Sequence, residues 1–106
     1  MEKNKRQIIE ITADEVQARL LRGDAPLIVD VREDEEVAHG MIPDAIHIPL
    51  AELDAWLNDW ELDDEIVFVC RTGRRSAVAC EQLTARGFVN VKNFVGGMFA
   101  WKGDLA

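Results

Sequence analysis

The stretch Val67-Phe68-Val69-Cys70-Arg71-Thr72-Gly73-Arg74-Arg75-Ser76 puts a cysteine at the end of an apolar run. The apolar residues Ile66 to Val69 predict a buried strand. A short loop with one glycine and three arginines follows, and a helical pattern begins near Ser76. The amides of such a loop and the N-terminus of a helix both stabilise negative charge. The stretch therefore predicts a reactive thiolate at Cys70, where the strand meets the helix.

Strands and helices alternate on both sides of this stretch. The expected strands are Ile8 to Ile11, Leu27 to Val31, Ala45 to Ile48, Ile66 to Val69 and a segment within Val89 to Val95. Helical patterns run from the Thr12–Glu15 capping box to Gly23, over Glu33 to His39, over Leu50 to Trp60, from Ser76 to Gly87, and from Gly96-Gly97 onward. This alternation predicts an α/β domain with a mainly parallel sheet. Ligands bind such sheets at the carboxyl ends of the strands, and Cys70 lies at one of these ends.

Length, composition and charge limit the classes of protein to consider. The 106 residues suit a single domain over 1–106, and 48% apolar residues provide a core. A net charge of -8 argues against nucleic acid or an anionic membrane as a partner, while a small anion needs only a local positive field. Met1 to Gln7 lacks the apolar segment of a secretion signal, and no apolar run approaches the roughly 20 residues of a membrane span. Two cysteines are too few for a disulfide framework, so a cytoplasmic location is expected.

The chemistry open to Cys70 is limited by what surrounds it in the sequence. An inert buried thiol would be out of place beside three arginines, because arginines need solvent or an anion. Acyl transfer by cysteine needs a nearby histidine base, and neither His39 nor His47 carries a recognisable partner signature. Attack of a thiolate on a sulfur–sulfur bond, with sulfite leaving thiosulfate, needs little proton transfer. It produces a persulfide on Cys70 that the loop amides would stabilise.

Four segments of the chain resemble the rhodanese family of sulfurtransferases. They are Val29-Asp30-Val31-Arg32 with Glu36, Gly40 to Pro49, Cys70 to Ser76, and Gly96-Gly97-Met98-Phe99-Ala100-Trp101. Each motif alone is weak, but four in the right order on an α/β pattern are strong evidence. The resemblance implies a five-stranded, mainly parallel sheet flanked by helices on both faces. It also implies a single-domain thiosulfate sulfurtransferase that uses no cofactor beyond a covalent persulfide.

The same resemblance implies a role for each matching residue. Cys70 takes the persulfide position, and the substrate-binding cradle around it consists of Arg71, Thr72, Gly73, Arg74, Arg75 and Ser76. Arg71 and Arg75 are the expected contacts of the donor anion. Asp30 and Arg32 are expected to support the loop from the neighbouring strand. The segment expected to pack beside the pocket contributes Gly97, Met98 and Trp101. The expected donor is a small sulfur-bearing anion, and the expected acceptor is cyanide or a thiol, including a thiol protein such as thioredoxin.

Two other functions are compatible with parts of the sequence. Cysteine phosphatases and rhodanese-like arsenate reductases carry five residues between the cysteine and an arginine, which puts that arginine at position 76. Ser76 stands there and Arg75 comes one residue early, so loop length favours sulfur transfer. The other alternative is a weakly catalytic or regulatory module that binds a protein partner. It is motivated by the acidic composition and by three departures from the family pattern, Met41 for His, Asp44 for Gly and Val37 for an aromatic residue.

Other side chains with chemical potential are expected to be structural. Cys80 shares a helical face with Ala77 and Leu83, which indicates a core residue. His39 and His47 have no third ligand at a suggestive spacing, so no metal site is expected. The acidic run Asp34-Glu35-Glu36 is typical of a solvated helix start, with a contact between Arg32 and Glu36.

Overall fold

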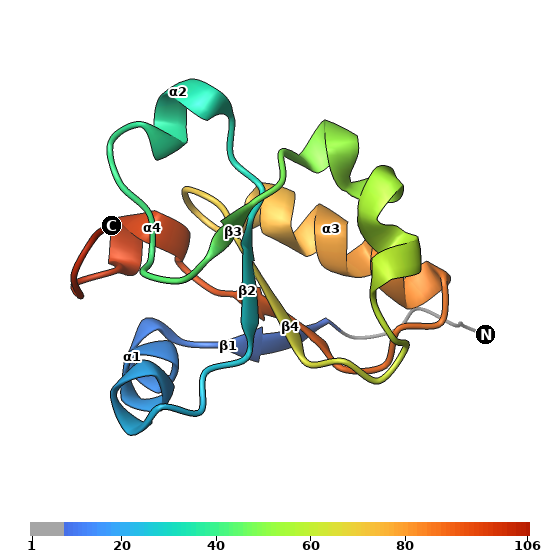
Figure 1. Cartoon of the computed structure of the whole chain (residues 1–106), viewed down its shortest axis with the longest axis horizontal. Helices are drawn as coiled ribbons and strands as arrows, with labels where there is room; N and C mark the ends of the chain where they lie inside the picture. The colour runs from blue at the N-terminus through green and yellow to red at the C-terminus, as the bar shows by residue number, and fades with distance from the viewer. Residues whose placement is uncertain (1–7) are drawn as a thin grey trace.

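Five parallel strands form one sheet in the computed structural model, which describes residues 8–106 (Figure 1). The expectations for Met1 to Gln7 lie outside the described residues. The strands are β1 (Ile9–Ile11), β2 (Leu27–Asp30), β3 (Ile46–His47), β4 (Ile66–Val69) and β5 (Val91–Phe94). Their order across the sheet is β1-β5-β4-β2-β3, with every neighbouring pair parallel. The predicted parallel α/β sheet is confirmed, and its most apolar strand, β4, lies at the centre.

Helical segments follow each strand in the order that the sequence predicts. They are α1 (Ala13–Arg22), α2 (Asp34–Val37), the 3-10 segment η1 (Leu50–Asp59), α3 (Arg74–Ala85) and α4 (Gly97–Ala100). The Thr12 capping box starts α1, and Gly23 ends it in the left-handed conformation at φ 79°. Two details differ from expectation. The segment after β3 forms 3-10 turns, and α3 begins at Arg74 because Gly73 takes the left-handed conformation (φ 105°) directly before it.

The side chains of β4 alternate between two apolar cores. Ile66 and Phe68 face the core covered by η1 and α3, whereas Val67 and Val69 face the core covered by α1 and α4. Figure 1 shows α1 and α4 on the left of the sheet and α3 on its right. The predicted covering of both sheet faces by helices is therefore confirmed. Cys70 follows β4 and belongs to the core that α3 covers.

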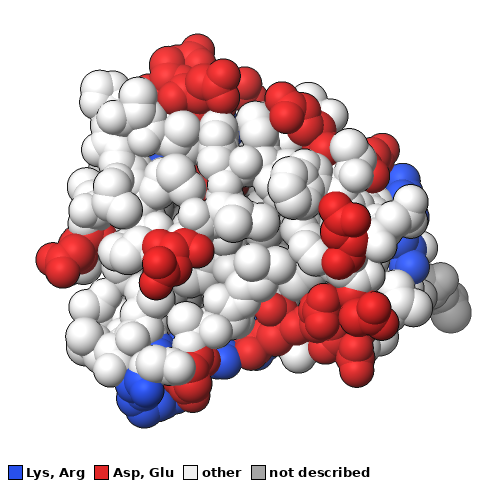
Figure 2. Space-filling view, in the orientation of Figure 1, with Lys and Arg blue, Asp and Glu red and all other residues white. Residues whose placement is uncertain are grey.

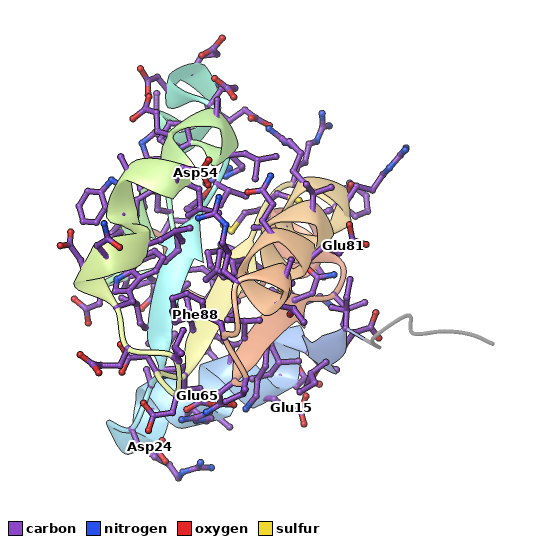
Figure 3. All side chains as sticks on the ribbon, turned by 90° about the vertical axis from the view of Figure 1, so that its right-hand side faces the viewer. Glu15, Asp24, Asp54, Glu65, Glu81 and Phe88 are labelled. Atoms are coloured by element: carbon purple, nitrogen blue, oxygen red, sulfur yellow. The ribbon has the colours of Figure 1, made fainter. Side chains whose placement is uncertain are left out.

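The two ends of β4 carry different polar groups. Glu65, just before the strand, forms ion pairs with Arg19 of α1 (2.5 Å) and Lys92 of β5 (2.6 Å). Figure 3 shows Glu65 near the lower end of the sheet, away from α2 at the top. Cys70 follows the strand at its other end. The charge triad therefore joins α1, β4 and β5 at the end of the sheet opposite the cysteine.

The surface reflects the acidic composition of the chain. Figure 2 shows negative side chains gathered at the top of the molecule, over α2, and again at its lower right. Within residues 8–106, no helix has the length and apolar character needed to cross a bilayer.

Candidate active site

The sulfur of Cys70 lies inside a ring of hydrogen-bond donors. Its residue is 1% exposed, directly after the last residue of β4. Its Sγ accepts a hydrogen bond from the backbone N–H of Gly73 (3.1 Å) and another from that of Ser76 (3.4 Å). The Ser76 hydroxyl oxygen lies 3.4 Å from the same sulfur. The end of the central strand therefore places the Cys70 sulfur next to the loop amides and the first turn of α3.

These contacts change the acidity of the Cys70 thiol. Burial alone would raise its pKa, but hydrogen bonds from the Ser76 hydroxyl and from the amides of Ser76, Gly73 and Thr72 outweigh burial. The net result is a pKa below the ordinary thiol value. The other cysteine behaves in the opposite way, because burial and the charge of Glu81 raise the pKa of Cys80 to about 12. Cys80 lies in the core between α3 and the sheet, as the sequence predicts, and both thiols are free.

Helix α4 holds the cysteine loop from the other side. The N–H of Met98 donates to the carbonyl of Cys70 (2.8 Å), and the N–H of Phe99 donates to the carbonyl of Arg71 (2.9 Å). Gly97 makes this approach sterically feasible, since a Cβ there would overlap the Cys70 carbonyl oxygen and lie 2.5 Å from that of Arg71. The structure therefore brings Gly97 and Met98 beside the loop, where the sequence analysis expects them.

Trp101 lies away from the cysteine loop. Its ring packs edge-on against Phe94 with centroids 6.0 Å apart, and its indole N–H donates to the carbonyl of Asp104 (3.0 Å). The contact with Phe94 belongs to the core under α1 and α4, whereas the contact with Asp104 is exposed. The expectation that Trp101 packs beside the pocket is therefore corrected. The Trp101 side chain packs on the opposite face of the sheet from Cys70.

The three arginines of the loop differ in whether they have partners. Arg75 forms a two-point ion pair with Glu36 of α2, with N–O distances of 2.7 and 2.8 Å. This pair lowers the pKa of Glu36 to about 2, because the hydrogen bonds from Arg75 outweigh burial. Arg71 and Arg74 are exposed and form no ion pair with any residue in 8–106. Arg75, one of the two arginines expected to hold the donor anion, is thus paired with Glu36, whereas the exposed Arg71 and Arg74 have no ion pair among residues 8–106.

Asp30 and Arg32 form a buried two-point ion pair next to this region. The Arg32 Nε–Asp30 Oδ1 distance is 2.9 Å and the Nη2–Oδ2 distance is 2.8 Å. Arg32 also donates to the carbonyl of Gly40 (2.8 Å) and, more weakly, to that of Glu36 (3.5 Å). The pair thus orders the segment that carries α2 and reaches the cysteine loop indirectly, through Glu36 and Arg75. The predicted contact between Arg32 and Glu36 is present through the Glu36 carbonyl, while the Glu36 carboxylate pairs with Arg75.

Asn93 is a site residue that the sequence analysis does not identify. It lies in β5, opposite Phe68 of β4, and is 6% exposed. Its Oδ1 accepts a hydrogen bond from the Ser76 hydroxyl (2.5 Å), and its Nδ2 donates to the carbonyl of Gly73 (3.1 Å). The sequence offered only a weak signal, a polar residue between Lys92 and Phe94 in a segment predicted to hold a strand. The burial that makes a polar residue informative is seen only in the structure.

Two of the departures from the family pattern have a visible structural setting. Asp44 takes the left-handed conformation (φ 69°), which glycine adopts most readily and aspartate tolerates better than most residues. Met41 pairs with Ala106 through backbone hydrogen bonds in both directions, of 2.9 and 3.4 Å. Neither residue contacts the sulfur, so both departures concern the segment between α2 and β3.

The two histidines do not assemble a metal site with other residues. His47 Nε2 lies 2.7 Å from the carbonyl oxygen of Arg32, and its Nδ1 lies 3.8 Å from an exposed carboxylate oxygen of Asp34. In the part of the chain that the structure describes, no three His, Cys, Asp or Glu side chains are grouped so that they could hold a metal ion. His47 thus serves to tie β3 to the segment after β2.

Comparison with known proteins gives a consistent result. A family model described as a rhodanese-like domain matches residues 12–104. YtwF of Bacillus subtilis (strain 168) is 41% identical over 98 residues, which cover 92% of this chain and 94% of that protein. The thiosulfate sulfurtransferase GlpE of Pseudomonas syringae pv. syringae (strain B728a) is 31% identical over 86 residues, covering 81% of each. The crystal structure of a rhodanese-like domain protein from Staphylococcus aureus superposes with a TM-score of 0.85 at 40% identity, covering 93% of this chain and 97% of that one.

Proposed function

Since this chain belongs to the rhodanese family and is a rhodanese-type sulfurtransferase, we propose that it carries sulfur as a persulfide on Cys70. The donor is thiosulfate or another persulfide, and the acceptor is a thiol or cyanide. The observation that carries the proposal is a thiol of lowered pKa, ringed by N–H donors at the carboxyl end of the central strand. The name of GlpE supports thiosulfate as the donor.

The reaction proceeds in two displacements at sulfur. The Cys70 thiolate attacks the outer sulfur of thiosulfate, a new S–S bond forms, and the S–S bond of thiosulfate breaks. Sulfite leaves with the electron pair of that bond. The acceptor thiolate or cyanide then attacks the outer sulfur of the persulfide, and the electron pair of the cysteine S–S bond returns to Sγ as a thiolate. No net oxidant or reductant is consumed in the two displacements.

The first turn of α3 supplies stabilisation for the outer sulfur of the persulfide. The leading N–H groups of a helix lack intrahelical acceptors, and here they belong to Arg74, Arg75 and Ser76. The Ser76 N–H already points to Sγ, which leaves the N–H groups of Arg74 and Arg75 for a sulfur bonded beyond it. The exposed side chains of Arg71 and Arg74 add the positive field that draws a dianionic donor to the loop.

Loop geometry favours a sulfur atom over a phosphate group. Phosphatase chemistry would need an arginine at position 76, where a free guanidinium would clamp two phosphate oxygens. Ser76 is fully buried and bonds to Cys70 and Asn93, and the preceding Arg75 is held by Glu36. A phosphoryl group in transfer would therefore lack its clamp, whereas the outer sulfur of a persulfide needs only the amides.

The acceptor in the cell is proposed to be a thiol, either small or carried by a protein such as thioredoxin. A thiolate acceptor regenerates Cys70 by the displacement described above, and it requires a compartment in which thiols stay reduced. The two free cysteines are consistent with the cytoplasm as that compartment.

Intact-mass measurement after thiosulfate treatment tests the proposal. We expect the protein to gain the mass of one sulfur atom and to lose it when a thiol or cyanide is added. Cys70→Ser should gain nothing, while Cys80→Ala, the matched control, should load like the parent because Cys80 is buried and its pKa is raised. An unmodified parent with thiosulfate and with a persulfide donor would favour a non-catalytic module that binds a protein partner.

The role of Arg71 has its own test. Arg71→Gln should raise KM for thiosulfate by roughly three- to ten-fold, the size of a charge-assisted contact at an exposed site. Arg22→Gln is the control, since Arg22 is also exposed but lies at the end of α1, paired with Asp24. An unchanged KM in Arg71→Gln, measured at low ionic strength, contradicts the assignment.

A further inference from the structure

The Ser76 hydroxyl lies between two groups that can each accept its single hydrogen. Its oxygen is 3.4 Å from the Cys70 sulfur and 2.5 Å from Asn93 Oδ1. Ser76 is fully buried and Asn93 is 6% exposed, so water does not replace either contact freely. A hydroxyl carries one hydrogen to donate, and two acceptors cannot both receive it.

The orientation of the Asn93 amide determines where that hydrogen points. The carbonyl oxygen of Gly73 can only accept, so the amide group 3.1 Å from it must be the NH2 group of Asn93. The amide oxygen then faces Ser76, and the hydroxyl donates its hydrogen to it. Towards Cys70 the hydroxyl presents lone pairs, which accept the S–H of a neutral thiol.

A charged sulfur reverses this preference. A thiolate facing hydroxyl lone pairs is repelled by them, whereas a hydroxyl that rotates its hydrogen to the sulfur forms a charge-assisted bond. The rotation breaks the bond to Asn93, which therefore competes with the thiolate. The competition ends when Cys70 becomes a thiol or the inner sulfur of a persulfide, because neither carries the charge.

We propose that Asn93 is a positioning residue that controls the nucleophilicity of Cys70 through the Ser76 hydroxyl. It holds the hydroxyl hydrogen while the sulfur is uncharged and yields it when the sulfur is a thiolate. No proton leaves the hydroxyl in either direction, since the change is a rotation about its C–O bond. The part of the proposal that concerns the persulfide rests on the proposed function, while the part that concerns the free thiol does not.

Two substitutions at Asn93 separate this role from simple support of the loop. Asn93→Ala removes the competing acceptor, so the hydroxyl serves the thiolate permanently and the thiol becomes more acidic. The expected gain in thiolate at a pH below the midpoint is roughly three- to ten-fold, the size of one hydrogen bond. Asn93→Asp keeps an acceptor for Ser76 and adds negative charge near the sulfur, so the thiol becomes less acidic. If Asn93 only supported the loop, both substitutions would shift the pKa of the Cys70 thiol in the same direction.

The pH profile of Cys70 alkylation by iodoacetamide, followed by peptide mass spectrometry, measures these shifts in the unloaded protein. The Asn93→Ala shift should disappear in a Ser76→Ala background, as a double-mutant cycle requires of a residue that acts through Ser76. Asn90→Ala, directly before the start of β5, is the control and should leave the profile unchanged. The proposal is overturned if both Asn93 variants shift alike, if Asn93→Ala shifts nothing, or if its shift persists without the Ser76 hydroxyl. Should Asn93→Ala fail to fold, an unchanged or lower midpoint in Asn93→Asp overturns it equally.

A second measurement concerns the loaded protein. At a fixed ratio of thiosulfate to sulfite, Asn93→Ala should show a lower fraction of persulfide by intact mass, because its free thiolate is the better stabilised state. An equal or higher persulfide fraction contradicts the proposal. If the parent takes up no sulfur, the proposed function fails, and the alkylation profile still decides the role of Asn93.

Discussion

Replacing Glu36 by Gln removes the carboxylate that holds Arg75 beside the cysteine loop. The pair has two short N–O distances, 2.7 and 2.8 Å, and it lowers the pKa of Glu36 from 4.5 to about 2. At about 1.4 kcal/mol for each pKa unit, the upper limit of its contribution to folding is roughly 3 kcal/mol. The side chains of Arg75 and Glu36 are 35% and 26% exposed, so solvent screening reduces this limit. We expect Glu36→Gln to lower the free energy of unfolding by about 1–2 kcal/mol at pH 7.

The sign of the pH dependence follows from the direction of the pKa change. The pKa of Glu36 is lower in the folded protein than in the unfolded chain. Its contribution to the free energy of unfolding is therefore complete above the unfolded pKa of 4.5 and is lost as the pH falls towards 2. Urea unfolding of the parent and of Glu36→Gln should therefore differ most at neutral pH and converge below about pH 3. If the parent and Glu36→Gln differ in unfolding free energy by the same amount at pH 7 and pH 3, the stabilisation does not come from this ion pair.

Glu65→Gln provides the matched control at the other end of the sheet. Hydrogen bonds from Arg19, and secondarily Lys92, lower the pKa of Glu65 to about 2 as well. Glu65→Gln should therefore lower the free energy of unfolding at neutral pH, and the loss should disappear as the pH falls towards 2. Glu36→Gln alone should change sulfur transfer, lowering KM for thiosulfate by about two- to three-fold, because it removes a negative charge close to the anion site. If Glu65→Gln lowers KM equally, the effect is not local and the reasoning fails.

Two further predictions concern the backbone of the site and its thiols. Gly97→Ala should destabilise the protein by about 3 kcal/mol, because Gly97 has a left-handed φ of 57° and an added Cβ would overlap the Cys70 carbonyl. Gly23 is also left-handed but has open space around it, so Gly23→Ala should cost only about 1 kcal/mol. Thermal unfolding measures both losses, and equal losses would contradict the steric argument. Iodoacetamide should modify Cys70 in the folded protein well below the pH at which an ordinary thiol reacts. Cys80, whose pKa is raised to about 12, should react only after unfolding. Modification of Cys80 in the folded protein would contradict its buried position.

Local interactions made much of this molecule predictable. The Thr12 capping box and Gly23 mark the ends of α1 because the groups involved are a few residues apart. The apolar run of β4 identifies a central strand because every residue in it must be buried on one face or the other. The ring of donors around Cys70 was foreseeable for the same reason, since Gly73 and Ser76 lie only three and six residues after the cysteine.

Predictions that depended on contacts between distant segments were less successful. Arg75 was expected to face the donor anion, but it pairs with Glu36, 39 residues earlier in the chain. Trp101 was expected beside the pocket, but it packs on Phe94 in the other core. A guanidinium or an indole has many suitable partners in a sequence, and the packing of α2 and α4 against the sheet selects one of them.

The sequence by itself determined the alternation of strands and helices, the parallel sheet and the cysteine loop, because hydrophobic period, caps and loop length act over a few residues. The tertiary structure decided which charges remain free and which groups tune the sulfur. Arg71 and Arg74 stay exposed because α2 brings Glu36 to Arg75 and to neither of them. Asn93 reaches Ser76 only because the parallel register of β5 on β4 places it opposite Phe68, two residues before Cys70. Register between strands is a property of the assembled sheet, and no local pattern in the chain contains it.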